Sequence, residues 1–204
     1  MDSKAHWEAM YRQRAPTEVS WYQTHPELSL ALIEATGIGR DAAIIDVGAG
    51  ASVLVDQLLD AGFTRVTALD ISATALQRAK ERLGERARLV TWVEGDVTAM
   101  PPLGPFDVWH DRALFHFLTE ADQRRRYLQA VEQQLAAGGH LIIATFALKG
   151  PPQCSGLPVQ CYSPETLRRE VGGRFELVEA REEAHRTPRN VLQSFLYARF
   201  RRTA

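Results

Sequence analysis

The sequence contains few cysteines, carries almost no net charge and has no long apolar run. Two cysteines among 204 residues, Cys154 and Cys161, are too few for a disulfide scaffold, which favours a reducing compartment. They are also spaced more widely than a metal-binding cysteine pair, so we expect no metal site. The formal net charge of −1 exerts no long-range attraction on nucleic acid or on an anionic membrane surface.

The chain also lacks the segments that would direct it into or across a membrane. No stretch approaches the ~20 apolar residues that a membrane-spanning helix needs. Residues 1–7 have no apolar core of the kind found in a secretory signal. Hydrophobic residues make up 45% and charged residues 24% of the chain, which is typical of a soluble globular protein. We therefore expect one cytoplasmic domain, without a membrane or nucleic-acid partner, as a monomer or homodimer.

The most informative stretch is residues 44–52, which predicts a buried strand, a glycine turn and the start of a helix. Gly48 and Gly50 have no Cβ, so backbone N–H groups there can approach a ligand closely. A second predicted strand ends in Asp70, 22 residues after Gly48, where a carboxylate can accept hydrogen bonds from both ribose hydroxyls. The pattern indicates a nucleoside or nucleotide site at the edge of a parallel sheet.

The residues around the glycine turn argue against a dinucleotide. Val53 occupies the position of the third glycine that packs the helix beneath a pyrophosphate. Asp46, two residues before Gly48, would repel a pyrophosphate. The same carboxylate could help to hold a cationic or zwitterionic ligand.

Apolar periodicity predicts alternating strands and helices. We expect strands at 42–47, 65–70, 89–93, 106–110 and 140–146, and helices at 26–36, 52–61, 72–83 and 119–136. The alternation predicts a parallel sheet with right-handed crossovers. After a loop and a short helix that begins at Pro164, two strands at 175–183 and 191–201 have a connection so short that they must run antiparallel.

Four stretches occur in the order found in one enzyme family. They are Asp46-Val-Gly-Ala-Gly50, Leu69-Asp-Ile-Ser72, Glu94-Gly-Asp-Val97 and Ala137-Gly-Gly-His-Leu141. The chain resembles the class I S-adenosylmethionine (SAM) dependent methyltransferases over roughly residues 40–147. The resemblance implies an α/β fold with a doubly wound, mostly parallel seven-stranded sheet in the order 3-2-1-4-5-7-6, its last strand antiparallel and helices on both faces. It implies a single domain over 1–204, with 1–37 as a helical lid and 148–163 as a loop on the substrate side.

The resemblance also implies which residues bind the cofactor, SAM. Asp70 would bind the ribose hydroxyls and Ile71 would pack on the adenine, while Asp96 would accept from the adenine amino group beside Val97. Alternatively, either carboxylate could cap the turn that follows its strand. The turn residues Asp46, Gly48, Ala49 and Gly50 complete this half of the site. His110 would meet the methionine part, and Trp21 and Tyr22 would cover the sulfonium, since aromatic faces attract cations.

Candidates for catalysis lie after the fourth strand. His110, Asp111 and His116 could supply a general base if the acceptor carries a proton that must leave. Each has an alternative: His110 could be hydrogen-bonded structurally, Asp111 could form an ion pair with Arg112, and His116 could face either the pocket or the core.

We expect methyl transfer by in-line displacement to an oxygen, nitrogen or sulfur of a small molecule. A protein lysine is the alternative acceptor, because Trp7, Tyr11 and the pair Trp21-Tyr22 resemble methyltransferases that modify translation elongation factors. Those enzymes often have Asp-Lys-Gly where this chain has Asp-Arg-Ala at 111–113. The chain also lacks the Asn- or Asp-Pro-Pro-aromatic signature of nucleic-acid base methyltransferases. A third possibility is a protein that binds SAM without catalysis.

Overall fold

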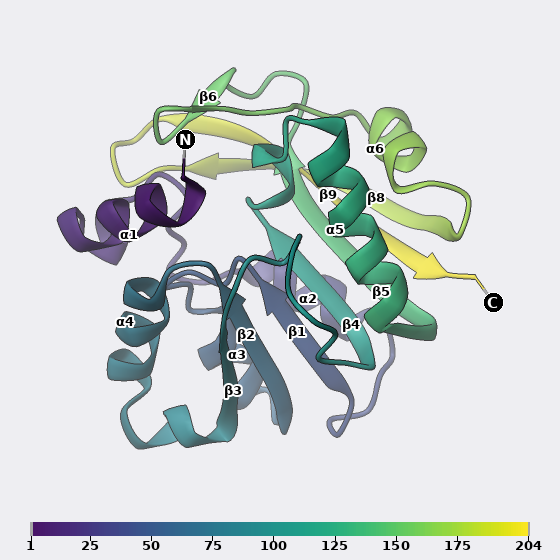
Figure 1. Cartoon of the computed structure of the whole chain (residues 1–204), viewed down its shortest axis with the longest axis horizontal. Coiled ribbons are helices and arrows are strands. Elements are labelled where there is room, and N and C mark those ends of the chain that lie inside the picture. The colour runs from purple at the N-terminus through teal and green to yellow at the C-terminus, as the bar shows by residue number, and fades with distance from the viewer. Residues whose placement is uncertain (1, 204) are drawn as a thin grey trace.

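A computed structural model describes residues 2–203, which form a seven-stranded sheet in the order β3-β2-β1-β4-β5-β9-β8 (Figure 1). Its strands are β1 (Ala43–Val47), β2 (Arg65–Asp70), β3 (Val90–Glu94), β4 (Phe106–Arg112), β5 (Leu135–Phe146), β8 (Phe175–Arg186) and β9 (Leu192–Arg202). The first five are parallel to one another, and β9 is antiparallel to both β5 and β8. Since β8 and β9 are the sixth and seventh strands of the sheet along the chain, the predicted order and the antiparallel last strand are confirmed.

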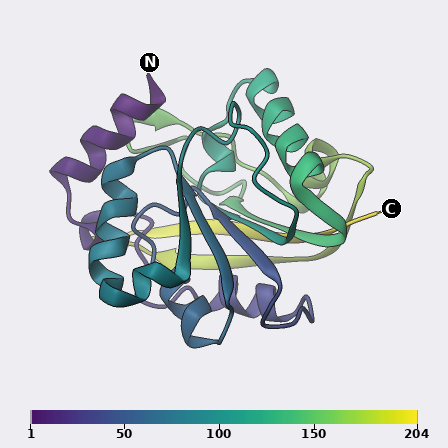
Figure 2. The same cartoon turned by 60° about the horizontal axis from the view of Figure 1, so that its bottom comes forward.

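Helices cover both faces of the sheet (Figure 1, Figure 2). They are α1 (Ser3–Gln13), α2 (Glu27–Glu34), α3 (Leu54–Asp60), α4 (Ala73–Leu83), α5 (Ala121–Gln134) and α6 (Pro164–Val171), with short 3₁₀ turns η1 (Pro16–Glu18), η2 (Gly84–Leu89) and η3 (Phe115–Phe117). Within residues 2–203, none of these helices is long and apolar enough to cross a membrane.

Alternating strand residues divide the core into two layers, as the two-residue period of a strand requires. Ile45 and Trp109 face the layer that α5 and α6 close, whereas Ile44 and Val108 face the layer under α2 and α3. All four side chains are fully buried. Strands buried on both faces explain the apolar runs that identified them in the sequence.

The ends of several elements differ from the prediction. Helix α5 begins after Glu120 rather than at Thr119, because the Gln123 side chain accepts from the Glu120 N–H in a capping arrangement. Strand β5 begins five residues earlier than His140, immediately after α5. The expected loop at 148–163 contains a small hairpin of β6 (Gln153–Cys154) and β7 (Leu157–Pro158).

Candidate functional site

The glycine turn after β1 is shaped by two left-handed residues. Gly48 has φ +67° and Gly50 has φ +55°, a conformation that side chains rarely adopt. A Cβ at Gly50 would lie 2.3 Å from the Tyr11 hydroxyl oxygen, so there is no room for one. The Ala49 N–H donates to the Leu69 carbonyl at 3.0 Å, which holds the turn against the end of β2. The turn is therefore a backbone surface at the carboxyl edge of the sheet.

Asp70 is fixed beside this turn. One oxygen accepts from the Gly50 N–H at 2.8 Å, and the other accepts from the Ser72 N–H at 2.8 Å. Burial raises the pKa of Asp70 to about 6, although both backbone donors oppose that shift. Because each carboxylate oxygen can accept more than one hydrogen bond, the side chain can still bind a pair of hydroxyls.

Asp46 is held by a buried chain of hydrogen bonds. Its Oδ1 lies 2.7 Å from Nδ1 of His110, and Nε2 of His110 lies 3.0 Å from Oγ of Ser29 on α2. All three residues are at most 3% exposed. Asp46 and His110 are neighbours because β1 and β4 pair in this register. No further hydrogen bond within residues 2–203 uses Oδ2 of Asp46, which is left for a ligand.

Helix α1 and the segment that follows it form an aromatic roof over this edge. Trp7 packs edge-on against Trp21, with ring centroids 5.8 Å apart, and against Phe117, at 5.0 Å. Tyr11 packs against Trp21 at 6.3 Å. Glu8 accepts from the Thr74 N–H at 3.1 Å, which ties α1 to the start of α4, and the two helices lie side by side in both views (Figure 1, Figure 2).

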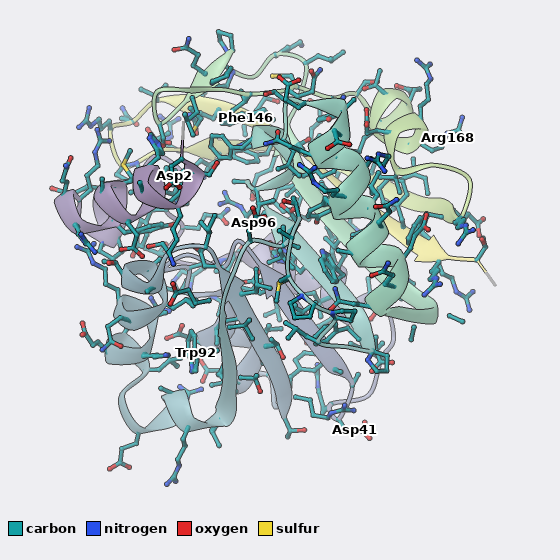
Figure 3. The ribbon with its side chains drawn as sticks, viewed as in Figure 1. Asp2, Asp41, Trp92, Asp96, Phe146 and Arg168 are labelled. Carbon is teal, nitrogen blue, oxygen red and sulfur yellow. The ribbon has the colours of Figure 1, made fainter. Side chains whose placement is uncertain are left out.

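The turn, the strand ends and the roof enclose a cavity of about 180 Å³. Its charged lining residues are Asp46, Asp70, Asp96 and Arg112, so carboxylates outnumber guanidinium groups. Asp96 lies near the centre of the molecule after β3 (Figure 3), and a single oxygen of its side chain accepts from both the Thr98 N–H and hydroxyl. Asp96 therefore caps its turn and still offers the other oxygen to the cavity.

The structure brings most of the predicted cofactor residues to this one cavity. Those that line it are Trp21, Tyr22, Asp46, Gly48, Ala49, Asp70, Ile71, Asp96, Val97 and His110. Gly50 adjoins the cavity through its contact with Asp70. The sequence assigned no site role to Ser29 or Phe117, because no local pattern distinguishes either one from an ordinary core residue.

These residues fit a cationic nucleoside such as SAM. Asp70 is placed to bind vicinal hydroxyls, and Asp96 offers an acceptor to an amino group. Ile71 and Val97 present apolar surface to a base, and Asp46 supplies negative charge beside the turn. The donor and acceptor pattern, rather than any single residue, makes the fit specific.

Asp111 does not line the cavity. It is fully buried and accepts from the Leu114 N–H at 3.1 Å, from the Phe115 N–H at 3.2 Å and from the Tyr127 hydroxyl at 2.7 Å. Burial raises its pKa to about 6 against these donors. Asp111 is therefore committed to holding the loop after β4 against α5.

The structure decides between the alternatives that the sequence left open for Arg112 and His116. Arg112 lines the cavity and donates to the Tyr197 hydroxyl at 2.7 Å and to the Trp21 carbonyl at 2.8 Å, so it does not pair with Asp111. His116 is fully buried, stacked on Phe146 at 4.5 Å, and both ring nitrogens lack partners among the described residues. Burial lowers its pKa to about 3, so it is a neutral core residue.

The sequence matches one protein-family model and several curated proteins. Residues 44–139 match the model of a methyltransferase domain. The eEF1A lysine and N-terminal methyltransferase of Mus musculus is 29% identical over 141 residues, which is 69% of this chain and 20% of that protein. EEF1A lysine methyltransferase 2 of Homo sapiens is 21% identical over 194 residues, 88% of this chain and 76% of that protein. The chain thus spans about a fifth of the longer relatives' length.

Solved structures share the fold at lower identity. One solved structure superposes on this chain with a TM-score of 0.79 at 23% sequence identity, over 98% of this chain and 93% of the solved chain. It was solved for the conversion of a disulfide bond into a thioacetal group during echinomycin biosynthesis. The N-methyltransferase NodS from Bradyrhizobium japonicum, in complex with S-adenosylhomocysteine, superposes with a TM-score of 0.75, at 18% identity, over 98% of this chain and 100% of its own. At these identities the likeness establishes the fold.

Proposed function

Because the chain belongs to the class I SAM-dependent methyltransferases and its cofactor is SAM, we propose that it transfers the methyl group of SAM to the side-chain nitrogen of a lysine in a protein. The observation that carries the proposal is the set of curated relatives, which are named for lysine methylation and align over as much as 88% of the chain. They favour the acceptor that the sequence placed second. None of those relatives is named for a small-molecule acceptor, which the sequence placed first.

The charge of the cavity supports an amine acceptor. Asp46, Asp70 and Asp96 line it against a single guanidinium, and the side chains of Trp7 and Trp21 line it as well. Both features attract a cation, and a lysine ammonium arrives as one. The Arg112 guanidinium donates to the Tyr197 hydroxyl, which donates in turn to the Glu183 carboxylate at 3.1 Å.

The residues of the chain contribute alignment and exclusion of water rather than bond-making groups. SAM supplies an activated methyl group that a neutral nucleophile can displace in line. The roof covers one side of the cavity, and the carboxylates are placed to orient the ligand. Alignment of this kind can account for several kcal/mol of the barrier. A lysine of ordinary pKa, about 10.4, must first lose a proton.

We assign His110 a positioning role in this reaction. Both of its ring nitrogens are engaged, one by Asp46 and the other by Ser29. The ring therefore fixes the direction of the Asp46 carboxylate rather than taking a proton from the acceptor. Asp111 and His116 lie outside the cavity, so we assign neither of them to proton transfer.

A small-molecule amine is a second candidate acceptor, favoured by the enclosure of the site. The cavity of about 180 Å³ is covered by α1 and by the segment around Trp21. A small acceptor would lie beneath this roof, whereas a protein must reach the site through its rim.

Methyl-labelled SAM distinguishes the acceptors. The enzyme is incubated with protein extract, with lysine peptides and with a panel of small amines, and the labelled products are separated by size and identified by mass spectrometry. Label on a protein lysine supports the proposal. Label in the small-molecule fraction alone supports the second candidate, and no label in any fraction, despite measured SAM binding, refutes both.

A further inference from the structure

Three exposed apolar side chains lie beside the connection between β8 and β9. They are Leu148, which is 66% exposed, Val191, which is 57% exposed, and Leu192, which is 59% exposed. The backbone places them together, because the Ala147 N–H donates to the Ser194 carbonyl at 2.9 Å. This bond lies one residue before Leu148 and two residues after Leu192, so apolar surface from the end of β5 and the start of β9 is exposed at one place.

The same two parts of the chain are basic. Residues 146–152 and 184–194 contain Lys149, Arg186 and Arg189 and no aspartate or glutamate. All three cations are exposed, and no ion pair among residues 2–203 uses any of them. We call these two segments the basic corner. It concentrates positive charge on a chain whose formal net charge is −1.

The turn at the tip of the basic corner is held by its own hydrogen bonds. Thr187 is 6% exposed, its N–H donates to the Val191 carbonyl at 2.9 Å, and its hydroxyl accepts from the Val191 N–H at 3.1 Å. The Asn190 N–H donates to the Thr187 carbonyl at 2.8 Å, and Arg186 donates to the Asn190 side chain at 2.6 Å. A turn that is already ordered loses little conformational entropy when a partner binds to it.

The basic corner adjoins the roof of the SAM cavity. Nε2 of His185 on β8 lies 2.7 Å from the Ser20 carbonyl oxygen, and Gln23 donates to Glu183 at 3.2 Å. Gln23 also lines the cavity. Both views place the connection between β8 and β9 on the side of the molecule that carries α1 (Figure 1, Figure 2). A protein that rests on the basic corner therefore lies against the roof.

We propose that the basic corner docks the acceptor protein through a segment that combines acidic and apolar side chains; this inference rests on the proposed function. Charge complementarity selects such a segment, because the unpaired cations attract carboxylates while the exposed apolar side chains are removed from water. A protein fits better than a membrane. Three cations are fewer than the roughly four to eight Lys or Arg residues of a cluster that binds anionic lipid.

The apolar part of the basic corner is tested by the double variant Leu148→Ser/Leu192→Ser. The readout is the initial rate of methyl transfer from labelled SAM to the proteins of one extract at low concentration, which is proportional to kcat/KM. We expect this rate to fall about tenfold or more, as truncating central interface side chains commonly does, and SAM affinity measured by calorimetry to stay unchanged. The matched control is Leu89→Ser/Leu103→Ser, which removes two leucines that are 53% and 39% exposed elsewhere and should transfer methyl groups like the wild type.

The charged part of the basic corner is tested by the double variant Arg186→Glu/Arg189→Glu. The rate of protein methylation by the wild type should fall as salt screens the cations, whereas the variant should be about tenfold slower at low salt and should lose this salt dependence. The matched control, Arg168→Glu/Arg169→Glu, reverses two exposed charges on α6. Arg168 and Asp2, which precedes α1, lie on opposite sides of the molecule (Figure 3). The control should keep both the rate and the salt dependence of the wild type.

The remaining results separate the possible failures. If both variants of the basic corner methylate protein as fast as the wild type, the docking inference is wrong and the proposed function stands. If the wild type methylates no protein, the proposed function fails and the docking inference fails with it. Light scattering and binding to phosphatidylglycerol vesicles test the other occupants. A wild-type dimer that the variants convert to a monomer, or vesicle binding that the variants lose, would assign the basic corner to a second copy or to a membrane and overturn the inference.

Discussion

Replacing Asp70 by asparagine should weaken SAM binding while changing the fold little. The carboxylate oxygens accept from the Gly50 and Ser72 N–H groups at 2.8 Å each, and the remaining acceptor capacity of the side chain is placed for two ribose hydroxyls. Asparagine keeps one acceptor oxygen and replaces the other by a donor. A hydrogen bond to a charged group is worth about 1.5–3 kcal/mol, so we expect the Kd to rise roughly 10- to 150-fold.

The stability of the same variant should change little near neutral pH. Burial raises the pKa of Asp70 from 3.8 to about 6, so the ionised side chain costs the folded state on the order of 3 kcal/mol at neutral pH. Asparagine removes that cost, but its amide nitrogen replaces the oxygen that one backbone N–H donates to. That N–H is left buried without an acceptor, which destabilises the folded state by about 1–3 kcal/mol. The two effects have opposite signs and similar size.

The raised pKa also gives the wild type two opposite pH dependences. The folded state binds the Asp70 proton more tightly than the unfolded state, so this residue's contribution to stability falls as pH rises from about 4 to about 6. SAM affinity moves the other way, because the ionised carboxylate accepts from both hydroxyls. Affinity should therefore fall as pH drops below about 6 in the wild type, and Asp70→Asn should lack this component.

Calorimetric titration with SAM, at neutral pH and near pH 5, measures these effects directly. The matched control is Asp107→Asn, whose carboxylate accepts from the Ala43 N–H at 2.8 Å at the opposite edge of the sheet. An Asp70→Asn protein that binds SAM as tightly as the control would refute the assignment of Asp70 to the cofactor.

Two further substitutions test the buried surroundings of the site. Burial lowers the pKa of His116 to about 3, so below pH 6.5 the unfolded chain takes up a proton at this residue that the folded chain does not. The free energy of unfolding of the wild type should therefore fall by about 2 kcal/mol between neutral pH and pH 5 because of His116 alone. Urea unfolding of His116→Phe should not show this fall in the free energy of unfolding, and the variant should keep methyl transfer. If the free energy of unfolding falls equally in both proteins between neutral pH and pH 5, the assignment of His116 to the core is wrong. Gly50→Ala places a Cβ 2.3 Å from the Tyr11 hydroxyl oxygen and should lower the free energy of unfolding by about 1–3 kcal/mol more than Gly62→Ala does. Gly62 also has a positive φ, but a Cβ there would meet no atom within 4 Å. Adding Tyr11→Phe to Gly50→Ala should regain part of the lost free energy of unfolding, because it removes the hydroxyl that the new Cβ meets. If nothing is regained, the strain lies in the backbone alone.

The sequence by itself determined the sheet, the glycine turn and the carboxylates at the strand ends. These features depend on local patterns: the apolar runs of the buried strands, the start of α4 after Ser72, and the residues at or near the end of each strand. Parallel strands place their carboxyl ends at one edge, and the resemblance to the methyltransferase family implied that Asp46, Asp70 and Asp96 share one site; all three line the same cavity.

Only the tertiary structure decided which polar side chains line that cavity and which hold the fold. Ser29 and His110 are 81 residues apart and share a hydrogen bond, and the side-chain donor to Asp111 is Tyr127 on α5. His116 could face the cavity or the core by sequence, and packing against Phe146 placed it in the core. Hydrogen-bond partners between distant elements depend on register and packing, which leave no periodic signal in the chain.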